Sequence, residues 1–570
     1  MNILGINYGG HDTSACIISK GKILAACEQE RYDKIKHSRN FPIDAIIDCL
    51  KISGLNISDI DIVSYGLDIK AKINNLYLKP IIKDPARINL FFQDIKKLYE
   101  NENIEKYIRK KLKFKKKIDF VNHHLCHLAS AYYVSKFKNS LVTSYDGVGE
   151  SNSALFGHAT NGKIRIVHDK NVFPDSLGLF YSAITFFLGW KHHCDEGIIM
   201  GLAPYGNPYA KVNKLQSSYI QLFRKMIKLD KKDPLSYRIN RDWISYNRVR
   251  DKWVSDLFYK TFGKKREYSH KLKQHHKNIA AALQLRLEEI VLSQLSFLKK
   301  KFKAEHLCIA GGVGLNCSLN GKISEKKIFK KIFIQPASGD SGVAVGAALV
   351  SYFKYNKNIN KKFNDSPYLG YVEKSNDIKK ILYNNKTKYS YRGDKIYEDT
   401  AKFLYKGKVV GWFQGQAEFG PRALGNRSIL CKPFPIKMKD HLNKNVKFRE
   451  VFRPFAPSVL VENLHEYFNI NQKSEHMLIA CKVKKNKKKA IPAVVHVDDT
   501  CRVQSVSKNK NERFWKLISE FKKLSNIPVL LNTSFNIKGQ PIVNDIEDAL
   551  KCFKKYKIDI LVIDKYLIKK

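Results

Sequence analysis

Two similar strand-and-turn patterns near the N-terminus constrain the fold of this chain more than any other feature. The first pattern has an apolar segment, a polar turn with glycines and two returning segments (Ile3–Ile6, 8–14, Ala15–Ser19 and Lys22–Ala26). The second follows about 135 residues later with the same parts (Ser140–Ser144, 146–150, Ser153–His158 and Lys163–His168). A polar glycine turn between strands can direct backbone N–H groups toward a phosphate. The repetition indicates a duplicated fold, although two ordinary hairpins would give the same pattern.

The length of the chain requires more than one domain. It has 570 residues, and single hydrophobic cores stop growing at roughly 250–300 residues. A polar stretch from 354 to 388, rich in Asn and Lys, marks the expected boundary. We therefore predict an α/β protein with domains over 1–365 and 370–570. The duplicated hairpins suit an actin-like ATPase fold for the first domain, with a helical insertion at about 207–300.

A histidine cluster lies between the two patterns. His123 and His127 are four residues apart in a segment with helical spacing, so they share one helix face. That spacing suits two ligands of one divalent metal ion, although a lone histidine pair is more often structural. Asp146 in the second turn supplies a carboxylate, and Asp340 follows the strand predicted over Ile332–Gln335. These four side chains are the candidate metal ligands.

A strand-to-helix turn is a candidate nucleotide site. His306–Ala310 has the composition of a buried strand and runs into a glycine turn, Gly311-Gly312-Val313-Gly314-Leu315-Asn316, that opens a helix. Glycines at such a turn let the backbone approach a phosphate or a base, and the helix N-terminus favours negative charge. A further turn over 336–342 contains Gly339. Taken alone, these glycine turns are not specific.

Cationic side chains gather in the C-terminal domain beside glycines and strand ends. Residues 415–428 hold two arginines, Arg422 and Arg427, together with three glycines and a serine. Further candidates follow along the chain (Lys447, Arg449, Arg453, Arg502, Asn532 and Ser534). Arginine forks match phosphate and carboxylate oxygens two at a time. A surface salt bridge is the simpler explanation for any one arginine, but not for the whole set.

The composition is strongly basic. The chain has 102 Lys and Arg against 53 Asp and Glu, a formal net charge of +49. Because the lysines are spread along the whole chain, solvated faces are the favoured explanation. The alternative is an anionic partner, such as nucleic acid, an acidic glycan or anionic lipid. Nucleic acid is disfavoured but stays open, because zinc-finger spacing and RNA-binding-sheet motifs are absent from the sequence.

Cysteine usage and the N-terminal residues indicate the cellular compartment in which we expect the protein. The 11 cysteines form no C-x-x-C pair, which indicates a reducing environment. The first residues lack the basic region and cleavage site of a signal peptide. The sequence contains no apolar run of ~18 residues, so we expect no membrane span. We therefore expect a cytoplasmic protein.

Eight motifs together resemble one enzyme family. They are N-Y-G-G-H-D-T-S-A (7–15), H-H-L-C-H (123–127), D-G-V-G-E (146–150), M-G-L-A-P-Y-G (200–206), G-G-V-G-L-N (311–316), G-Q-A-E-F-G-P-R-A-L-G-N-R (415–427), F-R-P-F-A-P (452–457) and N-T-S-F-N (532–536). With them the chain resembles the O-carbamoyltransferases of antibiotic and nodulation-factor biosynthesis over nearly its whole length. The arginine-rich segment is the most specific motif. The departures are small: Cys126 fills a small-residue position, and an acid stands in 498–502 where the resemblance leads us to expect glycine.

The resemblance implies an architecture and a reaction. The N-terminal domain is expected to be actin-like, similar to the transfer subunit of the tRNA threonylcarbamoyl-adenosine machinery. The C-terminal domain is expected to be an α+β, YrdC-like domain that forms an adenylate. There, carbamoyl phosphate and ATP would give carbamoyl-adenylate and pyrophosphate. In the N-terminal domain, the hydroxyl of a sugar or natural-product acceptor would take the carbamoyl group and release AMP.

The resemblance also assigns roles to residues. His123, His127, Asp146 and Asp340 would bind Fe²⁺ or another divalent metal, because imidazole with carboxylate suits iron better than magnesium. Arg422, Lys447, Arg453, Arg502, Asn532 and Ser534 would hold carbamoyl phosphate and the phosphates of ATP, which enters with Mg²⁺. Gly311, Gly312, Asn316 and Gly339 would hold the nucleotide. His11 and Lys36 fall at transfer-site positions, with Arg422 and Arg453 as the catalytic cations of the C-terminal domain. Asp12 and Glu196 are candidates for the general base, and a homodimer is compatible with this assignment.

Two rival functions stay open from the sequence. One is an N-transferase that acts on tRNA, like the threonylcarbamoyl machinery, which the net charge of +49 favours. That machinery normally divides its two halves between chains, and the C-terminal motifs here match the O-carbamoyl family. The other is a non-catalytic ATP-binding module, which the complete set of candidate metal ligands and arginines argues against.

Overall fold

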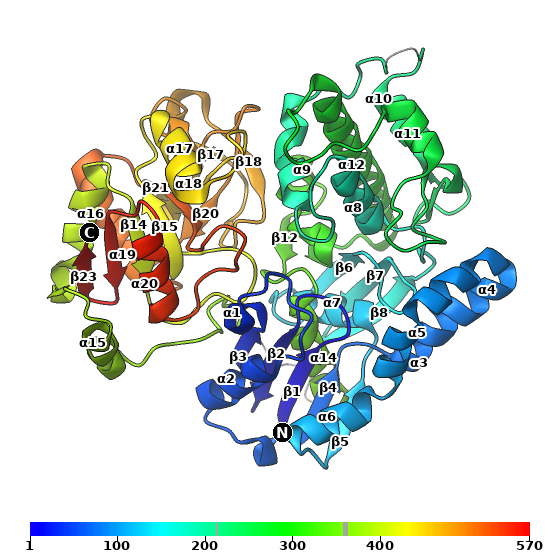
Figure 1. Ribbon diagram of the computed structural model, residues 1–570, viewed down its shortest axis with the longest axis horizontal. Helices are drawn as coiled ribbons and strands as arrows, with labels where there is room; N and C mark the ends of the chain where they lie inside the picture. The colour runs from blue at the N-terminus through cyan, green and yellow to red at the C-terminus, as the bar shows by residue number, and fades with distance from the viewer. Residues whose placement is uncertain (213–214, 357–362) are drawn as a thin grey trace. The chain divides into compact units, whose positions relative to one another are not determined.

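The chain forms two compact units (Figure 1). The computed structural model describes residues 1–212, 215–356 and 363–570. The first unit consists of Met1–Ile23 and Gly54–Asp365, and the second of Leu24–Ser53 and Ser366–Lys570. The first unit is an actin-like α/β structure and the second has an α+β arrangement, so the predicted fold class is confirmed.

The duplicated fold is visible in two five-stranded sheets of the same topology. The first has the order β3-β2-β1-β4-β5 and the second β12-β11-β6-β7-β8. The strands of the first sheet are β1 (Asn2–Asn7), β2 (Ser14–Ser19), β3 (Lys22–Glu28), β4 (Ile62–Tyr65) and β5 (Lys117–Phe120). Those of the second are β6 (Asn139–Tyr145), β7 (Ala154–Thr160), β8 (Lys163–His168), β11 (His306–Ala310) and β12 (Lys331–Ile334). In each sheet the first strand pairs antiparallel with the second and parallel with a later strand.

Two helices, α7 (His123–Tyr132) and α14 (Ser341–Tyr355), pack closely between these elements (Figure 1). Small residues in α14 make this possible. A Cβ atom on Gly346 would overlap the carbonyl of Cys126 in α7, and a Cβ atom on Gly5 in β1 would overlap the carbonyl of Ala344. Close approach of backbones is a general use of glycine. The packing places α7, with its histidines, against the helix that begins after Asp340.

The helical insertion predicted for about 207–300 is only partly helical. Its C-terminal part is the long helix α12 (Gln274–Phe302). The preceding part contains two short helices, α10 (Tyr219–Met226) and α11 (Asp256–Phe262), and a hairpin of β9 (Ile227–Leu229) and β10 (Tyr237–Ile239). Aromatic residues such as Trp243, Phe258 and Phe262 pack there without helical periodicity along the chain. Helices α8 (Leu177–Phe187) and α9 (Glu196–Leu202) precede this region.

A series of helices connects β4 to β5. It consists of α3 (Ile69–Lys72), a π-helical segment (Ile73–Leu78), α4 (Lys79–Lys83), a 3₁₀ turn (Pro85–Arg87), α5 (Ile88–Glu102) and α6 (Ile104–Leu112). Over the residues that the structure describes, none of the helices is both long and apolar enough to cross a membrane.

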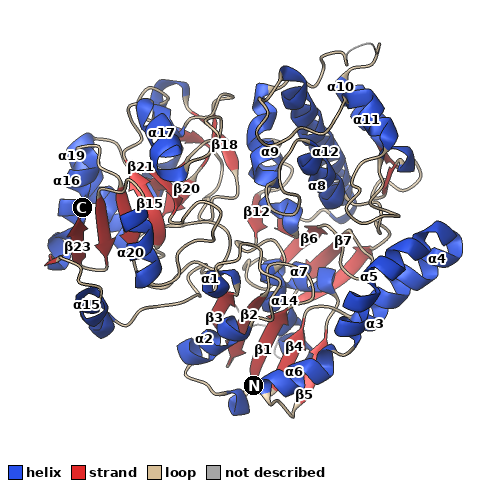
Figure 2. Ribbon diagram, viewed as in Figure 1, coloured by secondary structure: helices blue, strands red, loops and turns tan. Residues whose placement is uncertain are grey.

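The second unit is built on an eight-stranded sheet with helices on both faces (Figure 2). The strand order is β13-β23-β22-β14-β15-β21-β16-β20 (Ser390–Tyr391, Tyr566–Lys569, Ile560–Ile563, Val410–Phe413, Arg427–Cys431, Val529–Ser534, Ala456–Leu460 and Gln504–Val506). Val410 and Trp412 join a core with α16 (Ile396–Tyr405) and α19 (Glu512–Ser525). Phe413 joins the opposite core, with α15 (Ser375–Asn384), α17 (Lys437–Leu442) and α20 (Ile546–Lys555). Side chains therefore alternate between the two faces, as the pleat of a strand requires.

The segment Leu24–Ser53 departs from the sequence-based domain assignment, which placed it in the domain over 1–365. In the structure it belongs to the second unit. Arg31 donates a hydrogen bond to the carbonyl of Gly420 at 2.7 Å, and Lys34 pairs with Asp548. These contacts join residues several hundred positions apart, which local patterns in a sequence do not reveal. The resumption of the second unit at Ser366 lies close to the predicted boundary.

Candidate metal centre and cationic cluster

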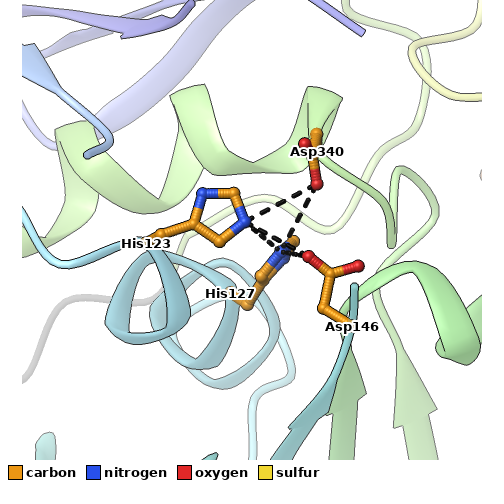
Figure 3. Close-up of side chains that lie close together, drawn as sticks. All are labelled: His123, His127, Asp146 and Asp340. Atoms are coloured by element: carbon orange, nitrogen blue, oxygen red, sulfur yellow. Dashed lines mark hydrogen bonds and ion pairs between the residues drawn. The ribbon is translucent and has the colours of Figure 1, made fainter. Parts of the chain in front are cut away.

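The four candidate metal ligands converge in the first unit (Figure 3). The Nε2 atoms of His123 and His127 each lie 3.2 Å from Oδ2 of Asp146. The same two nitrogens lie 3.6 Å and 3.9 Å from Oδ1 of Asp340. All four ligand atoms are within 4.8 Å of one another, and three of the four residues are buried. Residues separated by more than 200 positions thus form one group that can hold a metal ion.

Local structure explains this convergence. Asn122 caps α7 by accepting a hydrogen bond from the N–H of Leu125 at 2.9 Å, so the helix begins at His123 and its i, i+4 histidines share one face. Asp146 directly follows β6. Its Oδ1 accepts a hydrogen bond from the N–H of Gly312 at 2.9 Å, which leaves Oδ2 directed at the imidazoles. Gly312 therefore positions a candidate metal ligand.

The cluster is electrostatically self-consistent. Burial would lower the pKa of His123, but Asp340 and Asp146 raise it to about 10. Burial would raise the pKa of Asp146, but hydrogen bonds from His123 and His127 hold it well below its usual range. The two Nε2 atoms lie 3.2 Å apart, so a proton or a metal ion can lie between the imidazoles and the carboxylates. Two imidazole nitrogens and two carboxylate oxygens fit a divalent transition metal.

Glu150 is a residue of this site that the sequence analysis treated only as part of a turn. Its side chain is buried, with 2% of the residue exposed. Oε1 accepts hydrogen bonds from the backbone N–H groups of His123 and Asp68, both at 2.9 Å, and Oε2 accepts one from Nδ2 of Asn122 at 2.7 Å. Glu150 therefore holds the first turn of α7 in place. The acid that ends the D-G-V-G-E motif was the available signal.

His124, the middle histidine, has a structural role. Its ring nitrogens contact Oγ of Ser144 at 2.7 Å and the carbonyl of Asn152 at 2.8 Å. Burial and the neighbouring His123 lower its pKa to about 3, so the ring is neutral. Only the two histidines at the i and i+4 positions face the carboxylates.

His11 lies beside the metal centre. Its Nδ1 is 2.8 Å from Oδ2 of Asp12 and 3.8 Å from Oδ2 of Asp340. Asn7 fixes this loop by donating hydrogen bonds to the carbonyls of His11 and Asp12 at 3.2 Å and 3.0 Å. The second base candidate, Glu196, accepts hydrogen bonds from Oγ of Ser182 and the N–H of His193 at 2.5 Å and 2.6 Å. Asp12 is therefore the base candidate that lies next to His11.

The glycine turn predicted to bind the nucleotide has clear structural roles. Gly311 has φ of +85°, and a Cβ atom there would overlap the carbonyl of Tyr145. Asn316 caps α13 (Cys317–Glu325) by accepting from the N–H of Leu319 at 2.9 Å, and its Nδ2 donates to Gln284 at 2.9 Å. Gly339 directly precedes Asp340 and is partly exposed. Nucleotide binding by these residues stays a prediction.

A cationic cluster, defined by Lys447, Arg449, Arg453 and Arg502, lies in the second unit. Burial, Arg449 and Arg453 lower the pKa of Lys447 to about 7, and Lys36 contributes to this shift. Burial, Arg453 and Arg502 lower the pKa of Arg449 well below its ordinary value. The cations lie close enough to lower one another's pKa; Lys447 is buried and the three arginines are partly exposed. Lys36 was assigned to the transfer site, but the structure groups it with the second unit.

Few acids balance this cluster. Nζ of Lys447 donates to the carbonyl of Ser534 at 2.8 Å, to its Oγ at 3.2 Å and to Oδ1 of Asn536. Arg453 lies 3.6 Å from Glu450. Nε of Arg502 is buried and has no hydrogen-bond partner among the described residues. A buried lysine beside partly exposed arginines, with so little compensation, is suited to an anion.

Other polar residues of the same motifs stabilise the fold. Arg427 is fully buried and donates to the carbonyls of Gln414, Gly415 and Asn544 at 2.8–3.2 Å. Burial lowers its pKa to about 10. Asn532 is 1% exposed, and its Nδ2 donates to Oγ of Ser458 at 3.1 Å. Its amide is thus used inside the sheet, whereas Arg422 is only partly buried.

Comparison with protein families decides the class of the molecule. Residues 2–349 match the family described as carbamoyltransferase N-terminus, and residues 401–570 match the family described as carbamoyltransferase C-terminus. The chain belongs to the carbamoyltransferase family. The resemblance drawn from the motifs is therefore confirmed, and the protein is a transferase of carbamoyl groups.

Individual relatives span most of the chain. Nodulation protein NolNO of Sinorhizobium fredii is 35% identical over 98% of this chain and 79% of its own length. The uncharacterized protein sll1178 of Synechocystis is 34% identical over 100% of this chain and 97% of its own length. Among solved structures, component A of (R)-2-hydroxyglutaryl-CoA dehydratase from Acidaminococcus fermentans has a TM-score of 0.34 at 14% identity, covering 62% of this chain and 98% of that one. HypF of T. kodakarensis has a TM-score of 0.29 at 12% identity, covering 62% and 47%.

Proposed function

We propose that this carbamoyltransferase uses ATP and carbamoyl phosphate in two half-reactions, one in each unit. The second unit would form carbamoyl-adenylate, and the first would transfer the carbamoyl group to a hydroxyl group. The observation that carries the proposal is the cationic cluster, in which Lys447 is buried and Nε of Arg502 has no hydrogen-bond partner among the described residues. Cations held together in this way favour a ligand with several negative charges, as ATP and carbamoyl phosphate have.

Atom balance defines the first half-reaction. Carbamoyl phosphate must lose its phosphoryl group to water, which gives carbamate and inorganic phosphate. A carbamate oxygen then attacks the α-phosphate of ATP, and the bond to pyrophosphate breaks. Arg453, Arg502 and Arg422 would hold the phosphate oxygens, and Lys447 would stabilise the charge that develops on the leaving group. Ser534 positions Lys447 through the bond to its carbonyl.

In the second half-reaction, the acceptor hydroxyl attacks the carbamoyl carbon and AMP leaves. His123, His127, Asp146 and Asp340 would hold Fe²⁺ or another divalent metal, which when bound supplies Lewis-acid polarisation of the adenylate. His11 would accept the hydroxyl proton. If its Nδ1–H donates to Asp12, at 2.8 Å, Nε2 carries the lone pair that this step needs. The acceptor is expected to be a sugar or natural-product hydroxyl.

The experiment is a partial reaction without acceptor. Purified protein is incubated with ATP, carbamoyl phosphate, Mg²⁺ and Fe²⁺, and pyrophosphate and carbamoyl-adenylate are measured, the latter by mass spectrometry. We expect the wild type and Arg392→Ala, a control whose exposed arginine pairs with Asp399, to form both products. Arg453→Ala and Arg422→Ala should form neither. His127→Ala should form both.

Other outcomes would redirect the assignment. Pyrophosphate formation from bicarbonate and threonine, but not from carbamoyl phosphate, would support the tRNA N-transferase. ATP binding without any turnover, measured with an acceptor extract present, would support the non-catalytic module. Equal activity of Arg453→Ala and wild type would remove the role of the cationic cluster.

A further inference from the structure

An apolar helical arm projects from the first unit. We define the arm as Ile69–Glu102, which runs outward through α3 and α4 and returns through α5. It extends away from the two sheets of that unit (Figure 1). Its two legs pack on each other through the rings of Tyr77 and Phe91, whose centroids are 6.1 Å apart. The arm therefore has an ordered interior of its own.

The returning helix α5 is apolar on two faces, and only one of them is covered. Leu90 and Leu98 are buried, at 1% and 6% exposure. Ile88, Phe92, Ile95 and Tyr99 are exposed, with Phe92 at 59% and Tyr99 at 70%. These four follow one another at i, i+4, i+7 and i+11, so they line one face.

Two large apolar side chains of the outward leg are exposed as well. Leu78 is 47% and Ile82 is 82% exposed. Together with the four residues of α5, these two place six exposed large hydrophobic side chains within residues 78–99. Scattered single residues of this kind are ordinary, but such a concentration marks an interaction surface.

The charged residues near this surface differ in whether they form ion pairs. Asp84 and Asp94, the acids of α4–α5 whose side chains the structure describes, are paired with Arg248 and Arg250. These pairs, with the hydrogen bond from the N–H of Arg250 to Gln93 at 2.9 Å, also fix the arm to the rest of the first unit. Lys79 and Lys96 remain exposed next to Leu78 and Ile95. The arm thus presents apolar side chains with lysines beside them.

We propose that the arm docks the enzyme on the surface of a membrane that contains anionic lipid. The bilayer interface buries the apolar side chains, and its negative charge attracts the lysines and a chain of net charge +49. A second copy of this chain carries the same +49 and is repelled. Nucleic acid would attract the lysines but offers no apolar interior for Ile82 and Phe92. With 15 residues, α5 is too short to span a bilayer, so the docking is peripheral.

The test is binding of the full-length protein to vesicles. Phosphatidylcholine vesicles are compared with vesicles that also contain phosphatidylglycerol, by co-sedimentation at near-physiological salt. The decisive variant is Ile82→Ser/Phe92→Ser, which leaves every charge in place. The control is Tyr383→Ser/Ile436→Ser, which removes two side chains of similar exposure, 77% and 60%, from the second unit. Thermal melting and light scattering of each variant report folding and association state.

We expect the wild type and the control to bind the anionic vesicles and not the neutral ones. The arm variant should partition at least tenfold more weakly, while melting as the wild type does. Equal binding of the arm variant would show that charge alone attracts the protein and would overturn the proposal. A wild-type dimer that the arm variant breaks would overturn it too, because the surface would then belong to a second copy. The result does not depend on the proposed half-reactions.

Discussion

Replacing Glu150 by glutamine should both weaken metal binding and destabilise the fold. The carboxylate accepts from two backbone N–H groups and from Nδ2 of Asn122. A glutamine amide has one acceptor oxygen, so it must turn an N–H₂ group toward a donor. Asn122 cannot rotate to compensate, since its Oδ1 caps α7. One buried donor is left unpaired and the negative charge at the helix N-terminus is lost, at a cost of about 1–3 kcal/mol.

The substitution should lower metal affinity because His123, a candidate ligand, donates its backbone N–H to the carboxylate that is lost. Substitution of outer partners of metal ligands typically lowers affinity by about 10–100-fold, and we expect that range. The assay is a titration with Fe²⁺ or Co²⁺ in competition with a chelator, beside thermal melting of the metal-free protein. Asp119→Asn is the control, because Asp119 is a buried acid bound to Ser351 at 2.9 Å instead. Unchanged affinity in Glu150→Gln, or an equal loss in the control, would refute the positioning role. Absence of metal binding by the wild type would instead refute the metal centre itself.

Three further predictions concern packing, charge and the two arginines of one motif. Gly346→Ala should lower stability by about 1–3 kcal/mol, because the new Cβ overlaps Cys126 in α7, whereas Gly197→Ala has open space around it and should melt like the wild type. Sulfate, whose charge is constant near neutral pH, should bind more weakly as pH rises above about 7, since Lys447 deprotonates there in the free protein. Calorimetry in two buffers should show proton uptake on sulfate binding, and Lys447→Met should abolish that uptake. Binding heats that do not depend on the buffer would contradict this role of Lys447. Arg427→Met should lower the melting temperature strongly, because the buried carbonyls of residues 414, 415 and 544 lose the guanidinium that donates to them. Arg422→Met should melt normally and lose pyrophosphate formation; matching behaviour of the two variants would disprove the division.

The metal centre could be predicted from sequence because each part follows a local rule. Helical spacing places His123 and His127 on one face, and the carboxylates follow the ends of predicted strands. The duplicated topology then brings those strand ends together, since β11 pairs in parallel both with β6, which Asp146 follows, and with β12, which precedes Asp340. Glu150 escaped the same reasoning. Its role depends on backbone N–H groups, and a sequence does not show which backbone donors a side chain meets.

A motif alone does not predict the different roles of Arg422 and Arg427. Both stand in one short glycine-rich segment, and both have the same donors to offer a phosphate. Folding separates them: β15 carries Arg427 into the sheet, where the carbonyls of 414, 415 and 544 surround its guanidinium, while Arg422 stays in the preceding loop. The difference arises from burial: β15 pairs with β14, where Arg427 lies opposite Phe413, and with β21, which is about 100 residues away in the sequence.

For the arm, the sequence indicates a helix but does not show which of its apolar side chains are covered by the rest of the protein. The apolar residues of α5 recur at helical spacing on two faces of the helix. Tyr77 and Phe91 pack together within the arm, and Asp84 and Asp94, the acids of the arm whose side chains the structure describes, are paired with Arg248 and Arg250. Among the described side chains, the exposed surface is therefore apolar with lysines beside it. Lysine enrichment alone would spread attraction over the whole molecule, whereas the six apolar side chains all belong to the arm. For this reason, loss of binding on removing two uncharged side chains is the result that separates docking from simple charge attraction.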